Sequence, residues 1–204
     1  MSQSINNMQM KQEYTITIYT ENQIGLINKL AIIFTRRKIN IESINSSPSE
    51  VEGIYRFTLV VSETLEMVRK ICKQIEKLID VLKVYFNTND EIIYQEMALY
   101  KVPTDEVTDK IRVERMLREY GARAVVIRRD YIIFETTGQR DEINKLIEIL
   151  SPYGLIEFVR SARIAIIKNS DGFHGKIKEF EQNDPTPTQP ENETFSYDQN
   201  TFKV

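Results

Sequence analysis

Alternating and helical hydrophobic patterns follow one another in a fixed order at the start of the chain. Residues 14–19 alternate threonine with β-branched and aromatic side chains, which predicts a strand. After a polar turn at 20–23, apolar residues recur at helical spacing up to about residue 37. This spacing predicts a helix whose inner face carries Ile27, Leu30, Ala31 and Phe34, with Leu26 and Ile33 widening the apolar stripe. Residues 40–45 alternate again and predict a second strand.

The same two patterns complete the first half of the chain. A turn cluster rich in serine, with one proline and one glycine, joins residues 40–45 to a strand predicted at 55–61, which makes a hairpin. A second amphipathic helix begins at Ser62 or Glu63, and a strand is predicted at 81–87. The order strand, helix, strand, strand, helix, strand predicts a ferredoxin-like unit, with one four-stranded antiparallel sheet and both helices on one face.

A second run of elements follows the polar linker at 87–90. It consists of a strand at 92–102, a helix at 105–120, strands at 122–127 and 131–136, a helix at 139–150, and a strand at 153–159 that 163–167 could extend. This repeat lies in element order and not in residue identity. The expected fold class is therefore α+β, with two ferredoxin-like βαββαβ units.

The predicted domain boundaries follow from these patterns and from composition. We expect a flexible N-terminus at 1–12, a first unit at 13–88, a second unit at 91–168 and a disordered tail at 169–204. The tail is rich in Pro, Asn, Gln, Thr and Glu, and it cannot bury enough apolar surface to offset chain entropy.

Composition and charge exclude several classes of function. The chain has 204 residues, of which 41% are hydrophobic and 28% are charged, and these are ordinary values for globular proteins. A formal net charge of −3 disfavours nucleic acid and anionic membranes as partners. One cysteine and one histidine exclude an internal disulfide and a structural zinc site. No signal peptide or membrane span is recognisable, so we expect a cytoplasmic protein.

The turn between the first strand and the first helix is the main candidate site. Gly25 lies where the first amides of a helix lack internal partners, and such a turn can hold a carboxylate. Glycine lets a ligand approach the backbone closely, and the Asn22 amide could meet an ammonium group. The same residues also fit an ordinary helix start with an asparagine cap. Asn40, on a predicted edge strand, could face this turn from a second copy of the chain.

The remaining polar residues give no indication of catalysis. His174 has no nucleophile placed beside it by any known spacing, and Cys72 lies on the apolar face of a helix. Glu21 and Glu42 are most simply solvated carboxylates. We therefore expect no catalytic residue and no metal site in this chain.

Three segments carry a resemblance to a known family. Residues 22–27 read NQIGLI, residues 38–44 read KINIESI, and residues 74–84 read QIEKLIDVLKV. Together they resemble the ACT domain that opens the small, regulatory subunit of acetolactate synthase (acetohydroxyacid synthase). Residues 160–163, RSAR, are similar to the close of that family's second domain. The resemblance is strong over 14–84, weaker over 92–167 and absent from the tail.

This resemblance implies a non-catalytic regulatory subunit of a thiamine-dependent enzyme in branched-chain amino acid biosynthesis. It would activate the catalytic large subunit and confer allosteric feedback inhibition by valine, leucine or isoleucine. The effector of that family lies between the two ACT domains of a homodimer. Matching the motifs places the effector site at Asn22, Gly25, Leu26, Asn40 and Ile41. Thiamine diphosphate, magnesium and FAD would belong to the catalytic partner, with no cofactor in this chain.

Two other functions are compatible with the same element order. A free-standing ACT-domain sensor could control another enzyme or a transcription factor, although the second unit argues against it. RNA recognition motifs also share the order, but they need a basic sheet face with stacking aromatics, and residues 55–57 are only a faint echo of that pattern. Leu26 stands where the resembled family more often has alanine or valine, so which branched-chain amino acid binds stays open.

Overall fold

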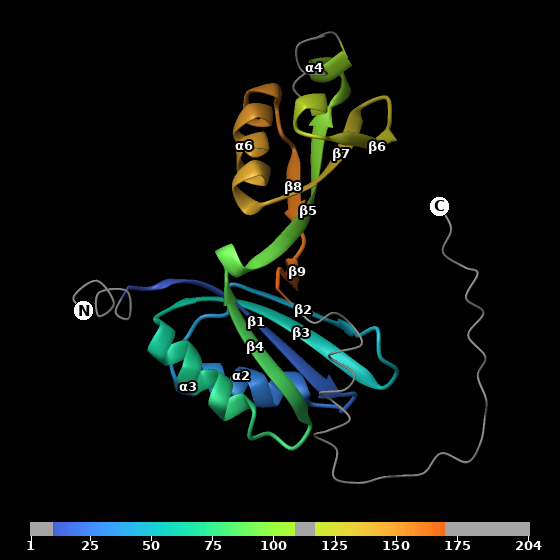
Figure 1. Cartoon of the computed structure of the whole chain (residues 1–204). Helices are drawn as coiled ribbons and strands as arrows, with labels where there is room; N and C mark the ends of the chain where they lie inside the picture. The colour runs from blue at the N-terminus through green and yellow to red at the C-terminus, as the bar shows by residue number, and fades with distance from the viewer. Residues whose placement is uncertain (1–9, 109–116, 170–204) are drawn as a thin grey trace. The chain divides into compact units, whose positions relative to one another are not determined.

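The structure is a computed structural model that describes residues 10–108 and 117–169 (Figure 1). Most of the predicted flexible N-terminus, the middle of the helix predicted at 105–120, and the predicted tail beyond residue 169 lie outside the described residues. His174 lies outside them as well.

The first sheet has four strands in the order β2-β3-β1-β4, and each neighbouring pair is antiparallel. Helices α2 and α3 cover one of its faces (Figure 1). This arrangement confirms the ferredoxin-like unit predicted from the element order. The elements are β1 (Gln12–Glu21), α2 (Leu26–Arg36), β2 (Ser43–Pro48), β3 (Ile54–Glu63), α3 (Leu65–Ile75) and β4 (Val81–Thr88).

Helix α2 buries four of the six residues of the predicted stripe. Its buried residues lie at i, i+4, i+7 and i+8 from the first residue of the helix: Leu26, Leu30, Ile33 and Phe34. The prediction that Ile27 and Ala31 face the core is wrong, because both are exposed. The helix carries more apolar residues than one face can bury, so periodicity alone did not separate the inner stripe from its margin.

The segment before β2 differs from the predicted strand. Lys38 has a left-handed backbone with φ 55°, which ends the helical region, and Ile39 is buried. The chain then runs through a loop, so that β2 begins at Ser43 and not at Asn40. Asn40 and Ile41 therefore lie in this loop, although β2 itself is an edge strand, as predicted.

The second sheet repeats the same topology, in the order β6-β7-β5-β8, with α6 packed against it. A further short strand, β9, pairs with the first part of β5. The elements are η1 (Asn89–Glu91), β5 (Ile92–Pro103), α4 (Thr104–Thr108), β6 (Arg123–Ile127), β7 (Tyr131–Gly138), α6 (Arg140–Leu150), η2 (Ser151–Tyr153), β8 (Glu157–Arg160) and β9 (Ile164–Ile167).

The last predicted strand begins later than expected. Residues 151–153 form a 3-10 turn, and Gly154 has a left-handed backbone with φ 76°. Strand β8 therefore starts at Glu157, and the strand predicted from residue 153 is wrong over its first four residues. Strand β9 extends the pairing along β5 after a break at 161–163.

Each sheet has a hydrophobic core of its own. The first core lies between the sheet and helices α2 and α3, and includes Ile16, Leu30 and Ile71 at 0% exposure. The second lies between the sheet and α6, where the Tyr100 hydroxyl donates a hydrogen bond to the Ile143 carbonyl at 3.0 Å. These two layered units confirm the α+β fold class for the described residues.

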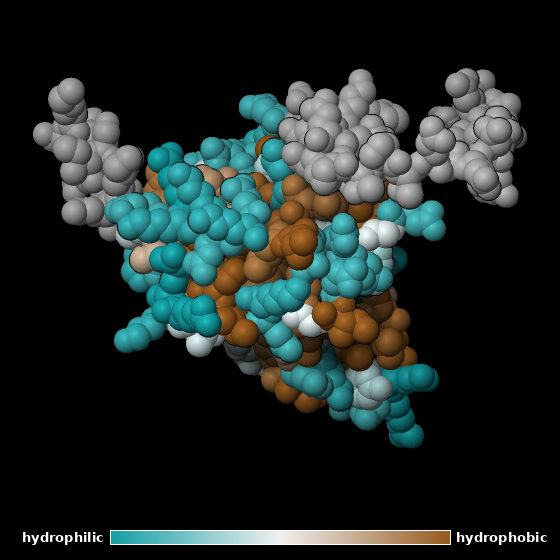
Figure 2. Space-filling model, turned by 90° about the horizontal axis from the view of Figure 1, so that it is seen from below, coloured by the Kyte–Doolittle hydropathy of each residue, from teal (hydrophilic) through white to brown (hydrophobic). Residues whose placement is uncertain are grey.

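The molecular surface mixes hydrophobic patches with hydrophilic side chains on the face drawn in Figure 2. Ile27 and Ile32 on α2 are each about half exposed. Within the described ranges, no helix is long and apolar enough to cross a membrane.

Candidate functional site

A cavity of about 190 Å³ opens where β1 passes into α2. The turn and the start of the helix form one side of it, and the hairpin of β2 and β3 forms the other. The lining residues are Glu21, Asn22, Gln23, Gly25, Leu26, Ile27, Ser46, Tyr55 and Phe57.

Gly25 is the residue that shapes this turn. It is the N-cap of α2, with φ 83° and ψ 4°, a left-handed conformation that side chains disfavour. A Cβ at this position would meet nothing within 4 Å, so the backbone angle and not crowding requires the glycine. No side chain caps the helix here. The amides of Leu26 and Ile27 therefore begin the helix without a side-chain acceptor.

Backbone hydrogen bonds hold the turn against its neighbours. The Asn22 amide donates to the Gly53 carbonyl at 3.1 Å, and the Glu21 amide donates to the Asp80 carbonyl at 3.0 Å. Lys29, one turn into α2, forms a 2.5 Å ion pair with the Asp80 side chain. The turn between β2 and β3 and the loop before β4 therefore fix the backbone, and Asn22 stays exposed.

The cavity combines apolar and polar walls. Leu26 and Phe57 are 2% and 6% exposed and belong to the first hydrophobic core, while Glu21 and Ser46 are exposed. The lining contains one carboxylate and no lysine or arginine. Positive potential at the cavity comes from the start of α2, where the helix dipole and free amides favour an anion.

The structure brings together three of the five predicted site residues. Asn22, Gly25 and Leu26 line the cavity. Asn40 and Ile41 are not among the described residues that line it within one chain: Asn40 is exposed, and Ile41 packs partly buried against the first core. Their contribution from a second copy of the chain stays a prediction.

Sequence reasoning missed the wall formed by the hairpin. Ser46 and Phe57 are partners in the β2–β3 register, which places both beside the turn. Tyr55, two residues earlier on β3, pairs with Pro48 and completes this wall. The hairpin was recognisable from the sequence, but its register was not, and register decides which side chains face the cavity.

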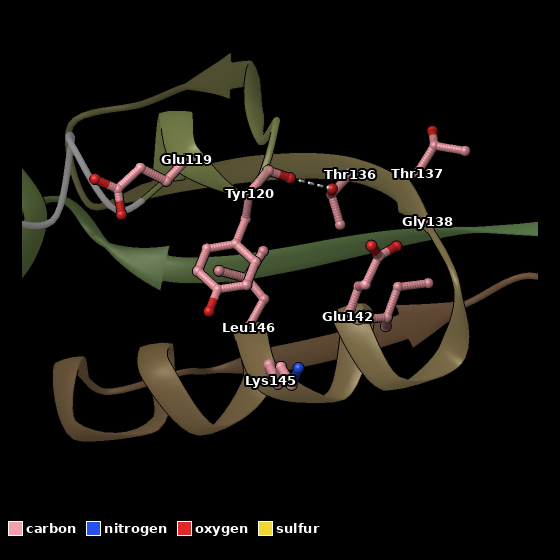
Figure 3. Close-up of a pocket in the computed structure, with 9 residues that line it drawn as sticks. Glu119, Tyr120, Thr136, Thr137, Gly138, Glu142, Lys145 and Leu146 are labelled. Carbon is pink, nitrogen blue, oxygen red and sulfur yellow. Dashed lines mark hydrogen bonds between the residues drawn. The ribbon is translucent and has the colours of Figure 1, made fainter.

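A second, larger cavity of about 310 Å³ lies in the second unit beside α6 (Figure 3). Its walls include Glu119 and Tyr120, β7 and the first turns of α6. The Glu142 carboxylate accepts a hydrogen bond from the Gln139 amide at 2.8 Å, and the Thr136 hydroxyl donates to the Tyr120 carbonyl at 3.0 Å. Glu142 therefore serves as a helix cap.

Neither cavity contains an activated nucleophile. The one cysteine, Cys72, is 4% exposed, and burial raises the pKa of its thiol to about 12. Burial also raises the pKa of Tyr100 to about 12. In the part of the chain that the structure describes, no group of three or more His, Cys, Asp or Glu side chains could hold a metal ion.

Comparison with known proteins covers both units. Residues 16–83 match the family described as the AHAS small subunit-like ACT domain, and residues 95–169 match the family described as the small subunit of acetolactate synthase. The first match covers most of the first sheet with its two helices, and the second match covers most of the second sheet.

Relatives with curated names match over nearly their whole length. The acetolactate synthase small subunit of Bacillus subtilis is 36% identical over 162 residues, which cover 79% of this chain and 92% of that protein. The probable acetolactate synthase small subunit of Archaeoglobus fulgidus is 30% identical over 160 residues, covering 78% and 98%. The crystal structure of the acetolactate synthase small subunit from Thermotoga maritima superposes with a TM-score of 0.70 at 28% identity, covering 78% and 99%. The chain therefore belongs to the family of acetolactate synthase small subunits.

Proposed function

We propose that this chain is the regulatory subunit of an acetolactate synthase and that it binds a branched-chain amino acid at the Gly25 turn. It activates the catalytic large subunit, and effector binding inhibits the holoenzyme in valine, leucine and isoleucine biosynthesis. The observation that carries this proposal is the cavity at the start of α2, which lies in the ACT unit and offers both polar and apolar walls.

The lining suits a small zwitterion with an aliphatic side chain. The amides at the start of α2 can hold the carboxylate, and the Glu21 carboxylate and the Asn22 carbonyl can receive the ammonium group. Leu26 and Phe57 provide an apolar surface for the side chain. Both charged ends are matched, which is necessary because an unpaired buried charge is costly. The 190 Å³ volume is below the roughly 300–1,000 Å³ of sites for drug-sized ligands, as expected for an amino acid.

A homodimer through the ACT unit would complete the site. Strand β2 is an edge strand, and edge strands offer unpaired backbone groups to a partner. Asn40 and Ile41 lie in the loop that leads into β2, and Asn40 is exposed. Paired copies would bring these residues of one chain to the Gly25 turn of the other.

The second sheet is the proposed contact for the catalytic large subunit. The face of this sheet that points away from α6 carries exposed apolar side chains. Leu99 pairs with Val159, and Met97 lies two residues before Leu99 on the same face of β5. They are 36%, 55% and 47% exposed. Exposed apolar patches of this kind are typical of interaction surfaces. Thiamine diphosphate, magnesium and FAD would be bound by that partner.

The test combines activity with direct binding. The purified chain is added to the catalytic subunit from the same genome, and acetolactate formation is measured with and without valine, leucine and isoleucine. Calorimetry on the chain alone measures the affinity for each amino acid. We expect a higher rate on adding the chain, and inhibition by at least one of the three. No change in rate would contradict the proposal and would favour a free-standing sensor.

Gly25→Asp tests the placement of the carboxylate. An aspartate at the N-cap puts a negative charge beside the amides that would hold the ligand, so we expect binding to weaken by roughly tenfold or more, as repulsion of one charge-assisted contact predicts. Gly121→Asp is the matched control, because Gly121 also has a positive φ with no neighbour within 4 Å of an added Cβ, and it lies in the second unit. Equal affinity in both variants would exclude this placement.

A further inference from the structure

Arg163 is fully buried and reaches from the second unit to the first. It is 1% exposed and lies in the break between β8 and β9. Its Nη1 donates to Thr15 Oγ1 and to Asn89 Oδ1, both at 3.0 Å, and its Nη2 donates to Glu13 Oε1 at 2.7 Å. The guanidinium carbon lies 3.9 Å from the centre of the Tyr94 ring. One side chain therefore ties β9 to β1 and to the η1 linker.

A second arginine makes a parallel set of contacts. Arg140 is the first residue of α6. Its Nη1 lies 3.3 Å from Glu13 Oε2 and 3.4 Å from Glu42 Oε2, and its Nη2 lies 3.2 Å from Glu96 Oε1. Glu13 is the second residue of β1, and Glu42 immediately precedes β2. Two strands of the ACT unit are thus bound at the same end by α6.

Glu96, on β5 of the second sheet, is the buried carboxylate that the arginines of the second unit share. It is 1% exposed, and besides Arg140 it contacts Arg160 Nε at 3.2 Å and Arg163 Nε at 3.7 Å. The cluster thus contains three guanidinium and three carboxylate groups, so its formal charges balance. We call this set the Arg163 cluster: Glu13, Glu42, Glu96, Arg140, Arg160 and Arg163.

The hydrogen bonding of this cluster is incomplete. Among the described residues, Arg140 Nε and Arg163 Nε have no hydrogen-bond partner, and Glu96 Oε2 has no hydrogen bond beyond its 3.2 Å ion pair with Arg160 Nε. A fully satisfied buried network rigidifies a core and specifies one geometry. The cluster therefore lacks part of the hydrogen bonding that would hold it to a single geometry. Buried ion clusters also contribute little net stability compared with apolar packing. This cluster therefore invites a role other than stabilising the fold.

The same two strands connect the cluster to the Gly25 cavity. Strand β1 has Glu13 near its first residue and Glu21, which lines the cavity, at its last. Strand β2 has Glu42 just before it and Ser46, which also lines the cavity, within it. Strand β1 is an inner strand of its sheet and is hydrogen-bonded on both sides, so it is a rigid element that joins the cavity to the cluster.

We propose that the Arg163 cluster is the relay through which an amino acid bound at the Gly25 turn controls the second unit, with Arg163 as the positioning residue. This inference rests on the function proposed above. Ligand binding shifts the turn and β1, and the position of the Glu13 carboxylate selects between pairings of Arg163 and Arg140. The relay couples binding to inhibition and contributes nothing to the ligand site itself.

Three variants separate coupling from binding. Arg163→Met removes the charge and keeps the length, Arg163→Lys keeps the charge but loses the planar fork, and Glu13→Gln removes the charge from the side of β1. Arg123→Met is the matched control, since Arg123 also pairs with a glutamate, Glu135, but within the second sheet and with its side chain 74% exposed. The holoenzyme is assayed for its rate with the chain added and for inhibition by valine, and calorimetry measures valine binding to each chain.

We expect all four variants to bind valine within about threefold of the parent. The valine concentration for half-inhibition should rise roughly tenfold in Arg163→Met and in Glu13→Gln, a change within the usual range of allosteric couplings. Arg163→Lys should recover part of the inhibition, and Arg123→Met should match the parent. The double variant Glu13→Gln/Arg163→Met should be no worse than either single one. Should Arg163→Met not fold, the lysine and glutamine variants carry the test.

Hydrogen exchange separates a failure of the relay from a failure of the proposed function. In the parent chain, valine should slow amide exchange at the Gly25 turn and also at residues 92–97 and 161–167; in Arg163→Met it should do so only at the turn. Inhibition that survives in all three cluster variants, or protection that never extends beyond the turn, overturns the relay alone. Absence of any valine effect on the parent chain and its holoenzyme overturns the proposed function and the relay with it.

Discussion

Glu13 and Arg163 are 150 residues apart in the chain, yet Arg163 Nη2 donates to Glu13 Oε1 over 2.7 Å. Asn89 shares both partners, since its Nδ2 donates to the same Glu13 oxygen at 3.0 Å and its Oδ1 accepts from Arg163. The first strand, the η1 linker and the break before β9 therefore meet at one buried point.

Because of this contact, the free energy of unfolding should vary with pH in the acid range. Burial alone would raise the pKa of Glu13, but hydrogen bonds from Asn89 and Arg163 and the charges of Arg163 and Arg140 together hold it below the ordinary 4.5. The ionised form is thus favoured in the folded state. The stabilisation is fully present above about pH 4.5 and is lost as the pH falls through the lower, folded value.

Glu13→Gln should therefore destabilise the chain most at neutral pH, by on the order of 1–3 kcal/mol, because a charge-assisted contact to buried Arg163 becomes neutral. The difference from the parent in free energy of unfolding should shrink below about pH 4.5. Urea unfolding at a series of pH values measures it. A difference that is the same at pH 7 and pH 3 would show that the Glu13 charge is not the cause.

Gly138 is required by the cap of α6. A Cβ at Gly138 would lie 2.6 Å from Glu142 Oε2, the oxygen that accepts from the Gln139 amide. Gly138→Ala should push this carboxylate out of the capping box and cost about 1 kcal/mol, the usual value of a helix cap. In a background of Glu142→Ala the same change should cost much less, because the cap is already absent. Additive losses in thermal unfolding would contradict this account.

Two residues of α2 test the inner stripe of the helix. Leu30 is 0% exposed, whereas Ile32 is 51% exposed. Leu30→Ala should cost roughly 2–5 kcal/mol, as for other buried leucines. Ile32→Ala should change the free energy of unfolding by less than about 0.5 kcal/mol, typical of surface sites. Denaturant titration of both variants compares them, and similar losses would mean that the exposed face of α2 is buried in an assembly.

Cys72 should be unreactive in the folded chain. Burial raises the pKa of its thiol to about 12, with a smaller contribution from the Glu76 charge, so almost no thiolate exists at pH 8. We expect a thiol reagent such as an aromatic disulfide to label it only after denaturation. Rapid labelling of the native chain at pH 8 would show that α3 opens locally from the first core.

Hydrophobic periodicity was sufficient for the order of the elements and for the turn at Gly25. The order of elements, the edge position of β2 and the position of Gly25 at the start of α2 were all predictable, because each depends on local backbone preference and on the period of apolar residues. Element ends were less predictable. The loop at Asn40 and the late start of β8 follow from left-handed residues, Lys38 and Gly154, whose effect depends on the contacts around them.

Contacts between distant segments were decided by the tertiary structure. The hairpin wall of the cavity depends on the pairing of Ser46 with Phe57, and a shift of one residue would turn these side chains away. The RSAR segment was noticed as a resemblance, but nothing in its neighbours indicates that Arg163 would be buried against Glu13. The sequence determines which segments become strands and helices because those preferences are local. Which charges share a buried site depends on how the sheets bring residues together, and this information exists only in the folded chain.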